Sequence, residues 1–114
     1  MSLQAQIDLK TLSQYEDDTD LLARVVEMWA LQSDTDLAEI QAAALREDLE
    51  SVRRLAHRCK GAAATLGAAG CAASFLKLEE LAHSRVICDL TRAIESCAVE
   101  VDAAVAALRE LLAG

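Results

Sequence analysis

His57 is the residue in this chain best suited to chemistry, because a neutral imidazole is a nucleophile and can gain or lose a proton near neutral pH. Lys60 follows one helical turn later and lies about 60° round a helix from His57. Gly61 and Ala64 lie within about 40° and 20° of the histidine, and neither has a bulky side chain. A nucleophile, a cation and two small residues therefore share one helical face, which predicts a surface that a second molecule can approach.

The opposite side of the same predicted helix is apolar. Its members recur at three and four positions, which predicts a stripe that faces a core: Val52, Leu55, Cys59, Ala62 and Leu66. His57 lies roughly 160° from Cys59 and about 180° from Leu66 on a helical wheel. We therefore expect its ring to face water.

This run of sequence resembles the histidine-containing phosphotransfer (HPt) domains of bacterial and plant phosphorelays. The family pattern is Ala-His, two residues, Lys-Gly, small residues and often Leu-Gly-Ala. It reads here as Ala56-His57, Lys60-Gly61, Ala62-Ala63-Ala64 and Leu66-Gly67-Ala68, with a Leu-Glu pair downstream at Leu78-Glu79. The resemblance covers most of the chain, and the combined spacing is more specific than a lone His-x-x-Lys-Gly.

The resemblance implies a phosphorelay protein of two-component signal transduction. His57 would accept a phosphoryl group from a receiver-domain aspartate and pass it, as phosphohistidine, to another receiver domain. The partners would be receiver domains of hybrid sensor kinases and response regulators. These would bring the Mg²⁺, so no metal or cofactor is expected in this chain. The sequence has no P-loop or ATP-binding glycine motif, so we expect a phosphocarrier intermediate and not an enzyme with its own turnover.

The resemblance also implies roles for the neighbours of His57. Lys60 would neutralise phosphate oxygens after transfer. Gly61 and Ala64 would let the backbone of the partner come close. Glu79 would flank the active face and could orient the imidazole or a water molecule, although a carboxylate would also repel phosphate.

Three arginines, Arg53, Arg54 and Arg58, precede or flank the histidine. A charge run of this kind is usually a solvated helix face. The other interpretation is that it steers an acidic receiver pocket towards the site. His83 occupies a position where the family often has arginine. A histidine there would make a positive charge near the phosphoryl group weaker or dependent on pH.

Two other functions remain open from the sequence. The first is a non-catalytic helical interaction module that binds a receiver domain without phosphotransfer. The second is a metalloprotein that uses His57 or His83 together with the four cysteines, which are Cys59, Cys71, Cys88 and Cys97. The cysteines are widely separated and form no Cys-x-x-Cys motif, which favours reduced thiols within a helical core over a zinc site.

Composition predicts an all-α fold, because the chain has no proline, only four glycines and 3% aromatic residues. Its 114 residues form one expected domain, 1–114. Apolar periodicity and capping residues predict a short helix over 7–15, a long helix after Asp18 or Thr19 with a possible break at 33–36, and further helices over 48–66, 71–84 and 90–112, the last capped by Asp89. Short connections favour an antiparallel up-down four-helix bundle with a short extra N-terminal helix.

Charge and hydropathy limit the partners. The net charge of −8 predicts repulsion from nucleic acid and from anionic membranes. No apolar run approaches the roughly 18 residues of a membrane span, and no signal-peptide pattern is present. We therefore expect a cytoplasmic protein, and a closed bundle of this size predicts a monomer. The sequence leaves open whether residues 1–3 are native.

Overall fold

Helices make up almost all of the chain that the computed structural model describes, residues 7–114. They are α1 (Leu9–Leu12), the 3-10 helix η1 (Ser13–Tyr15), α2 (Thr19–Leu45), α3 (Leu49–Thr65), α4 (Ala69–His83) and α5 (Leu90–Ala113). The predicted all-α fold is confirmed. The question about residues 1–3 falls outside the described part. No helix within residues 7–114 is long and apolar enough to cross a membrane.

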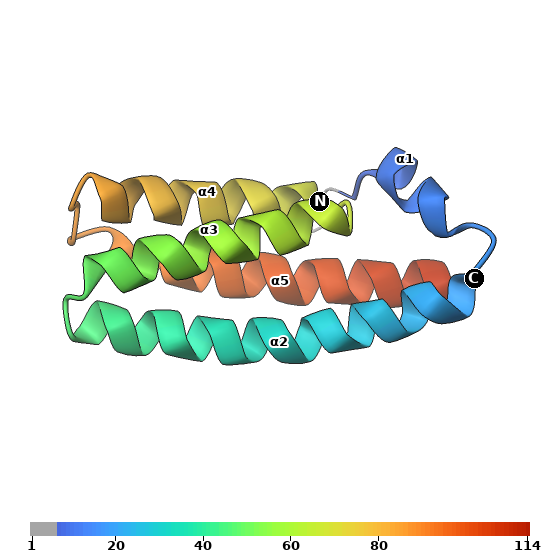
Figure 1. Ribbon diagram of the computed structural model, residues 1–114, viewed down its shortest axis with the longest axis horizontal. Helices are drawn as coiled ribbons and strands as arrows, with labels where there is room; N and C mark the ends of the chain where they lie inside the picture. The colour runs from blue at the N-terminus through green and yellow to red at the C-terminus, as the bar shows by residue number, and fades with distance from the viewer. Residues whose placement is uncertain (1–6) are drawn as a thin grey trace.

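The four long helices lie side by side, and each runs antiparallel to the next along the chain (Figure 1). Helix α3 packs on α2 and α4, and α5 packs on α4 and α2, so that the four helices close a ring around one core. Helices α2 and α4 therefore occupy opposite corners of the bundle. This is the antiparallel up-down four-helix bundle that the sequence predicts, with the short N-terminal helix lying at one end (Figure 1).

Aspartates begin two of the long helices, as the sequence predicts. The Asp18 carboxylate accepts a hydrogen bond from the Leu21 amide at 2.9 Å, and Asp48 accepts one from Ser51 at 3.2 Å. Asp89 occupies the cap position of α5, but its side chain makes no capping hydrogen bond. The possible break at 33–36 does not occur, because α2 is continuous from Thr19 to Leu45.

Gly67 joins α3 to α4 and holds the N-terminal segment against the end of the bundle. Its φ of +72° is a left-handed conformation that glycine adopts without strain. The Gly67 carbonyl accepts a 2.6 Å hydrogen bond from the amide of Asp8. A Cβ atom at this position would lie 2.7 Å from the Asp8 carbonyl oxygen. Glycine is therefore required both for the turn and for the close approach of the two backbones.

The apolar face of α3 differs slightly from the predicted stripe. Val52, Leu55, Cys59 and Leu66 are buried as predicted, but Ala62 is exposed. Ala56 and Ala63 are buried in its place. The physical reason is that α3 packs against both α2 and α4, so that its buried face is wider than one stripe and is turned towards α4.

Apolar side chains outside α3 also lie in water, among them Met28 and Leu9. Trp29 is buried, but the adjacent Met28 is 68% exposed. In the N-terminal segment Ile7 and Leu12 pack against the core, whereas Leu9 is exposed. A periodic pattern locates an apolar face, but it does not decide which of two adjacent apolar residues belongs to that face.

Candidate functional site

His57 lies in the middle of α3 and faces water, as the helical wheel predicts. The side chain is 64% exposed, and its Nδ1 atom lies 3.0 Å from Oε2 of Glu79 on α4. A carboxylate has no proton to donate, so Nδ1 must carry the hydrogen of this hydrogen bond. The lone pair of the neutral ring then resides on Nε2. The site therefore presents a nucleophilic nitrogen on an exposed ring that is held at its other nitrogen.

Glu79 connects His57 to Lys60. Its second oxygen, Oε1, lies 3.0 Å from Nζ of Lys60, so that one carboxylate contacts both residues. Partial burial of Glu79, whose side chain is 18% exposed, opposes ionisation. The hydrogen bonds from Lys60 and His57 outweigh this effect and hold the pKa of Glu79 below its usual value of 4.5. Glu79 is therefore an anion at neutral pH.

Lys60 is more buried than His57, with a side chain that is 29% exposed. Its position one turn further along α3 allows the ammonium to reach α4, where it pairs with Glu79. The cation expected to serve a phosphoryl group on His57 is thus already held beside the ring by the same carboxylate that holds the ring.

Gly61 and Ala64 are both exposed on α3, next to the histidine along the helix. A Cβ atom added at Gly61 would meet nothing within 4 Å. No contact within residues 7–114 therefore requires a glycine there, in contrast to Gly67. The surface beside His57 is open to the approach of another molecule.

The predicted arginines surround this cluster, and two of them pair with other carboxylates. Arg53 donates from Nε to Glu50 at 3.2 Å within α3, and Arg58 donates to Asp36 of α2 at 2.8 Å. Arg54 is exposed. His83 is exposed in the last turn of α4, one turn beyond Glu79. The structure therefore brings His57, Lys60 and Glu79 together and places the basic residues around them.

Asp36 is a site neighbour that the sequence analysis missed. It is only 5% exposed, and its carboxylate accepts hydrogen bonds from Gln32 at 3.0 Å and Arg58 at 2.8 Å, with Sγ of Cys59 at 3.5 Å. These contacts fasten α2 to α3 beside His57. One feature of the sequence could have indicated its burial. Asp36 lies four residues, about one helical turn, before the core residue Ile40 and therefore on the same face of the helix.

Three of the four cysteines, Cys59, Cys71 and Cys97, are buried, whereas Cys88 is exposed. Burial raises the pKa of the three buried thiols to about 12, and at Cys59 the Asp36 carboxylate adds to the effect. No group of three or more His, Cys, Asp or Glu residues within the described residues is placed to hold a metal ion. The buried thiols are therefore protonated residues of the core at neutral pH.

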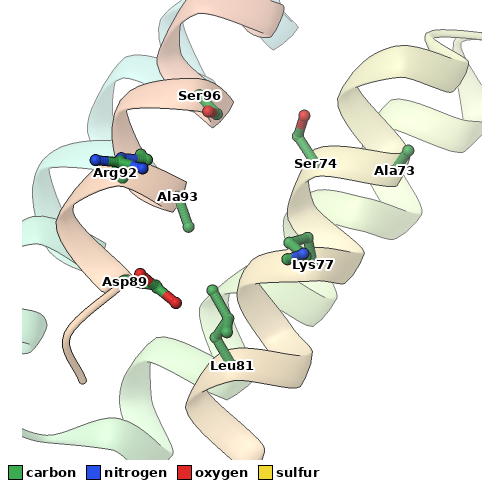
Figure 2. A pocket seen from close by; sticks show the side chains of 8 residues that line it. All are labelled: Ala73, Ser74, Lys77, Leu81, Asp89, Arg92, Ala93 and Ser96. Atoms are coloured by element: carbon green, nitrogen blue, oxygen red, sulfur yellow. The ribbon is translucent and has the colours of Figure 1, made fainter. Parts of the chain in front are cut away.

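A hollow of about 490 Å³ lies between α4 and α5. Figure 2 shows Lys77 and Leu81 of α4 on one side of the hollow and Asp89 and Arg92 on the other. None of the predicted site residues lines it. This hollow thus lies away from the α3–α4 face that carries His57.

The sequence model of the family described as Hpt domain matches residues 24–113. This match covers most of α2 and the whole of α3, α4 and α5. A search of curated proteins found no match.

Proposed function

This chain belongs to the Hpt domain family, the phosphotransfer modules of two-component signalling, and we propose that His57 is its phosphoacceptor. The observation that supports this proposal most strongly is the contact of Glu79 with both His57 and Lys60 on an exposed face. This contact leaves Nε2 of the ring unprotonated and accessible. It also keeps a cation within one turn of the ring.

The proposed donor is a phosphorylated aspartate of a receiver domain. Nε2 of His57 attacks phosphorus, a nitrogen–phosphorus bond forms and the bond from phosphorus to the aspartate oxygen breaks. The electron pair of the broken bond stays on the aspartate carboxylate. Transfer to a second receiver domain reverses these steps. Glu79 accepts the Nδ1 hydrogen and stabilises the positive charge that develops on the ring in the transition state, which speeds transfer in both directions.

Lys60 is proposed to exchange partners during transfer. Its Nζ atom lies 3.0 Å from Glu79 in this structure. A phosphoryl group on Nε2 carries more negative charge than Glu79 and attracts the ammonium. The flexible stem of a lysine allows the short movement. We propose that Gly61 and Ala64 leave the space in which the receiver backbone approaches, since both are exposed.

Charge on α3 supports a receiver domain as partner. The chain carries a net charge of −8, yet α3 holds four basic residues: Arg53, Arg54, Arg58 and Lys60. Arg53, Arg58 and Lys60 pair with carboxylates of this chain, whereas Arg54 is exposed. The excess of basic over acidic residues on α3 attracts an acidic pocket and speeds productive encounter. We propose the receiver domains of hybrid sensor kinases and response regulators as partners, with Mg²⁺ supplied by the receiver, in the cytoplasm. The chain acts as a phosphocarrier without an ATP site of its own.

The experiment incubates the protein with phosphorylated receiver domains and follows transfer of labelled phosphate. Label on this chain that is labile in acid and stable in base supports a phosphohistidine. Binding of the receiver without label on the chain contradicts the proposal and favours the non-catalytic interaction module.

A further inference from the structure

The outer face of α2 carries an apolar stripe that no other part of residues 7–114 covers. Its eight members are all exposed and recur at alternating intervals of three and four residues; six are apolar, and Arg24 and Thr35 are polar. They are Leu21, Arg24, Met28, Leu31, Thr35, Ala38, Ala42 and Leu45. Met28, Leu31 and Leu45 are 68%, 72% and 83% exposed. Seven-residue spacing sustained over more than three repeats is the pattern of a helix that pairs with another helix. A run of exposed apolar side chains of this length marks an interaction surface.

This stripe is separate from the His57 site. The buried face of α2, which includes Val26 and Ile40, points roughly the opposite way on a helical wheel. Helix α2 packs on α3 and α5, and it forms an edge of the bundle in Figure 1. His57 lies on α3, a neighbour of α2, but its ring is bonded to Glu79 on the side of α3 that borders α4. A partner on the outer face of α2 therefore leaves the imidazole accessible.

We infer that the α2 stripe binds the α2 stripe of a second copy of this chain, in an antiparallel two-fold dimer, in place of the monomer that the size of the bundle predicts. The two-fold arrangement sets large side chains against small ones. Its layers pair Leu21 with Leu45 of the partner subunit, Arg24 with Ala42 of the partner subunit, Met28 with Ala38 of the partner subunit and Leu31 with Thr35 of the partner subunit. A parallel pairing sets Arg24 against its own copy, which is repulsive.

Charge complementarity also favours the antiparallel pairing. Arg24 faces Ala42 of the partner subunit, and Glu39 lies one turn before Ala42 on the same helix. Both Arg24 and Glu39 are exposed. Arg46, the other charged neighbour of Ala42, lies 3.7 Å from Asp48 of its own chain. Two-fold symmetry then gives two pairs of Arg24 with Glu39 of the partner subunit in each dimer.

The size of the stripe predicts a weak dimer. From Leu21 to Leu45 the helix rises about 36 Å, and a helix is about 10 Å wide, so the contact strip is roughly 360 Å² on each chain. The total of about 720 Å² is well below the roughly 1,200–2,000 Å² of stable interfaces, and complexes of this size are weak and transient. The charge of −8 on each copy opposes association at low salt. We therefore expect the dimer to strengthen as salt rises, which is the opposite of the salt dependence expected for steering of a receiver domain.

Sedimentation equilibrium of the full chain between about 10 μM and 1 mM tests the inference, a range suited to weak complexes. We expect a monomer–dimer equilibrium that Leu31→Glu weakens by roughly tenfold or more. Val99→Glu is the matched control, since Val99 is 59% exposed on α5, and it is expected to leave the dimer unchanged. Circular dichroism checks that both variants fold. A monomer at every concentration and salt, or equal effects of the two substitutions, overturns the inference.

A charge exchange tests the antiparallel geometry. Arg24→Glu and Glu39→Arg each weaken the dimer, and the double variant recovers it to within about threefold of the wild type. Absence of recovery overturns the antiparallel pairing. A Leu31→Glu variant that keeps its oligomeric state but loses receiver binding shows that the receiver covers the stripe, and this result also overturns the inference. Phosphoryl uptake by wild-type protein is measured alongside, because it depends on His57 and not on the dimer.

Discussion

Nδ1 of His57 and Oε2 of Glu79 lie 3.0 Å apart and join α3 to α4 at the exposed face of the bundle. The contact assigns the hydrogen of the neutral ring to Nδ1, because the carboxylate only accepts. It also restricts rotation of a ring that is otherwise surrounded by water. The nucleophile is therefore oriented before a partner binds, which lowers the entropic cost of transfer.

Replacing Glu79 tests this orientation. Glu79→Ala removes the acceptor, so we expect a mixture of ring tautomers and transfer that is roughly ten- to hundredfold slower, the equivalent of one hydrogen bond to a charged group. Nitrogen-15 NMR of the imidazole and the transfer rate measure the two effects. Glu79→Gln is the control, because its amide oxygen still accepts the Nδ1 hydrogen. An alanine variant with wild-type tautomer populations and rate removes Glu79 from the proposed site.

Lys60 is expected to act on the phosphoryl group and not on the fold. Lys60→Ala slows transfer by roughly tenfold through loss of a charge-assisted contact. It costs less than about 1 kcal/mol of unfolding free energy, because the Lys60–Glu79 pair is partly solvated. Transfer kinetics and urea unfolding measure these effects. Arg54→Ala is matched for charge and lies on the same helix. Equal kinetic effects of the two substitutions would mean that only the net charge of α3 matters.

Two substitutions of Gly61 test stability and receiver docking separately. Gly61→Ala is expected to stabilise the chain by about 0.5–1 kcal/mol, because glycine within a helix is unfavourable and the added Cβ meets nothing within 4 Å. Gly61→Phe is expected to keep the fold and weaken receiver binding, since the ring occupies the approach to His57. Thermal unfolding and binding titrations check the two results. Receiver affinity unchanged by phenylalanine would place the docking surface elsewhere.

The sequence predicted the helices and the exposed ring because both depend on local periodicity. Asp18, Asp48 and Gly67 mark helix ends through hydrogen bonds and a backbone conformation set by neighbouring residues. His57 lies opposite the apolar stripe of its own helix, so its exposure also follows from the wheel. Family resemblance, and not periodicity, suggested a role for Glu79.

Contacts between helices could not be predicted in the same way. Arg58 resembled a solvated or steering residue, yet it donates to Asp36, 22 residues away in the sequence. Asp36 itself lay within a polar cluster that predicted a possible break in α2. Its burial depends on the register between α2 and α3, which a single helical wheel does not contain. The exposure of Met28 and Ala62 likewise depends on how neighbouring helices pack.

The Asp36–Arg58 contact predicts a structural role for Arg58. Arg58→Met leaves the Asp36 carboxylate buried with a weaker set of partners, and we expect a loss of about 1–3 kcal/mol of unfolding free energy. Arg54→Met is the control and is expected to change stability by less than about 0.5 kcal/mol, because Arg54 is exposed. Urea unfolding measures both. Equal stability of the two variants would show that Asp36 does not depend on Arg58.

The most direct test compares wild-type protein with His57→Gln in phosphoryl uptake from a phosphorylated receiver domain. The glutamine side chain is close in size to the imidazole and His57 is 64% exposed, so the bundle is expected to stay folded. We predict that the wild type takes up label that is labile in acid and stable in base, and that the variant takes up none. Uptake by the variant at the wild-type level would contradict the assignment of His57 as the phosphoacceptor.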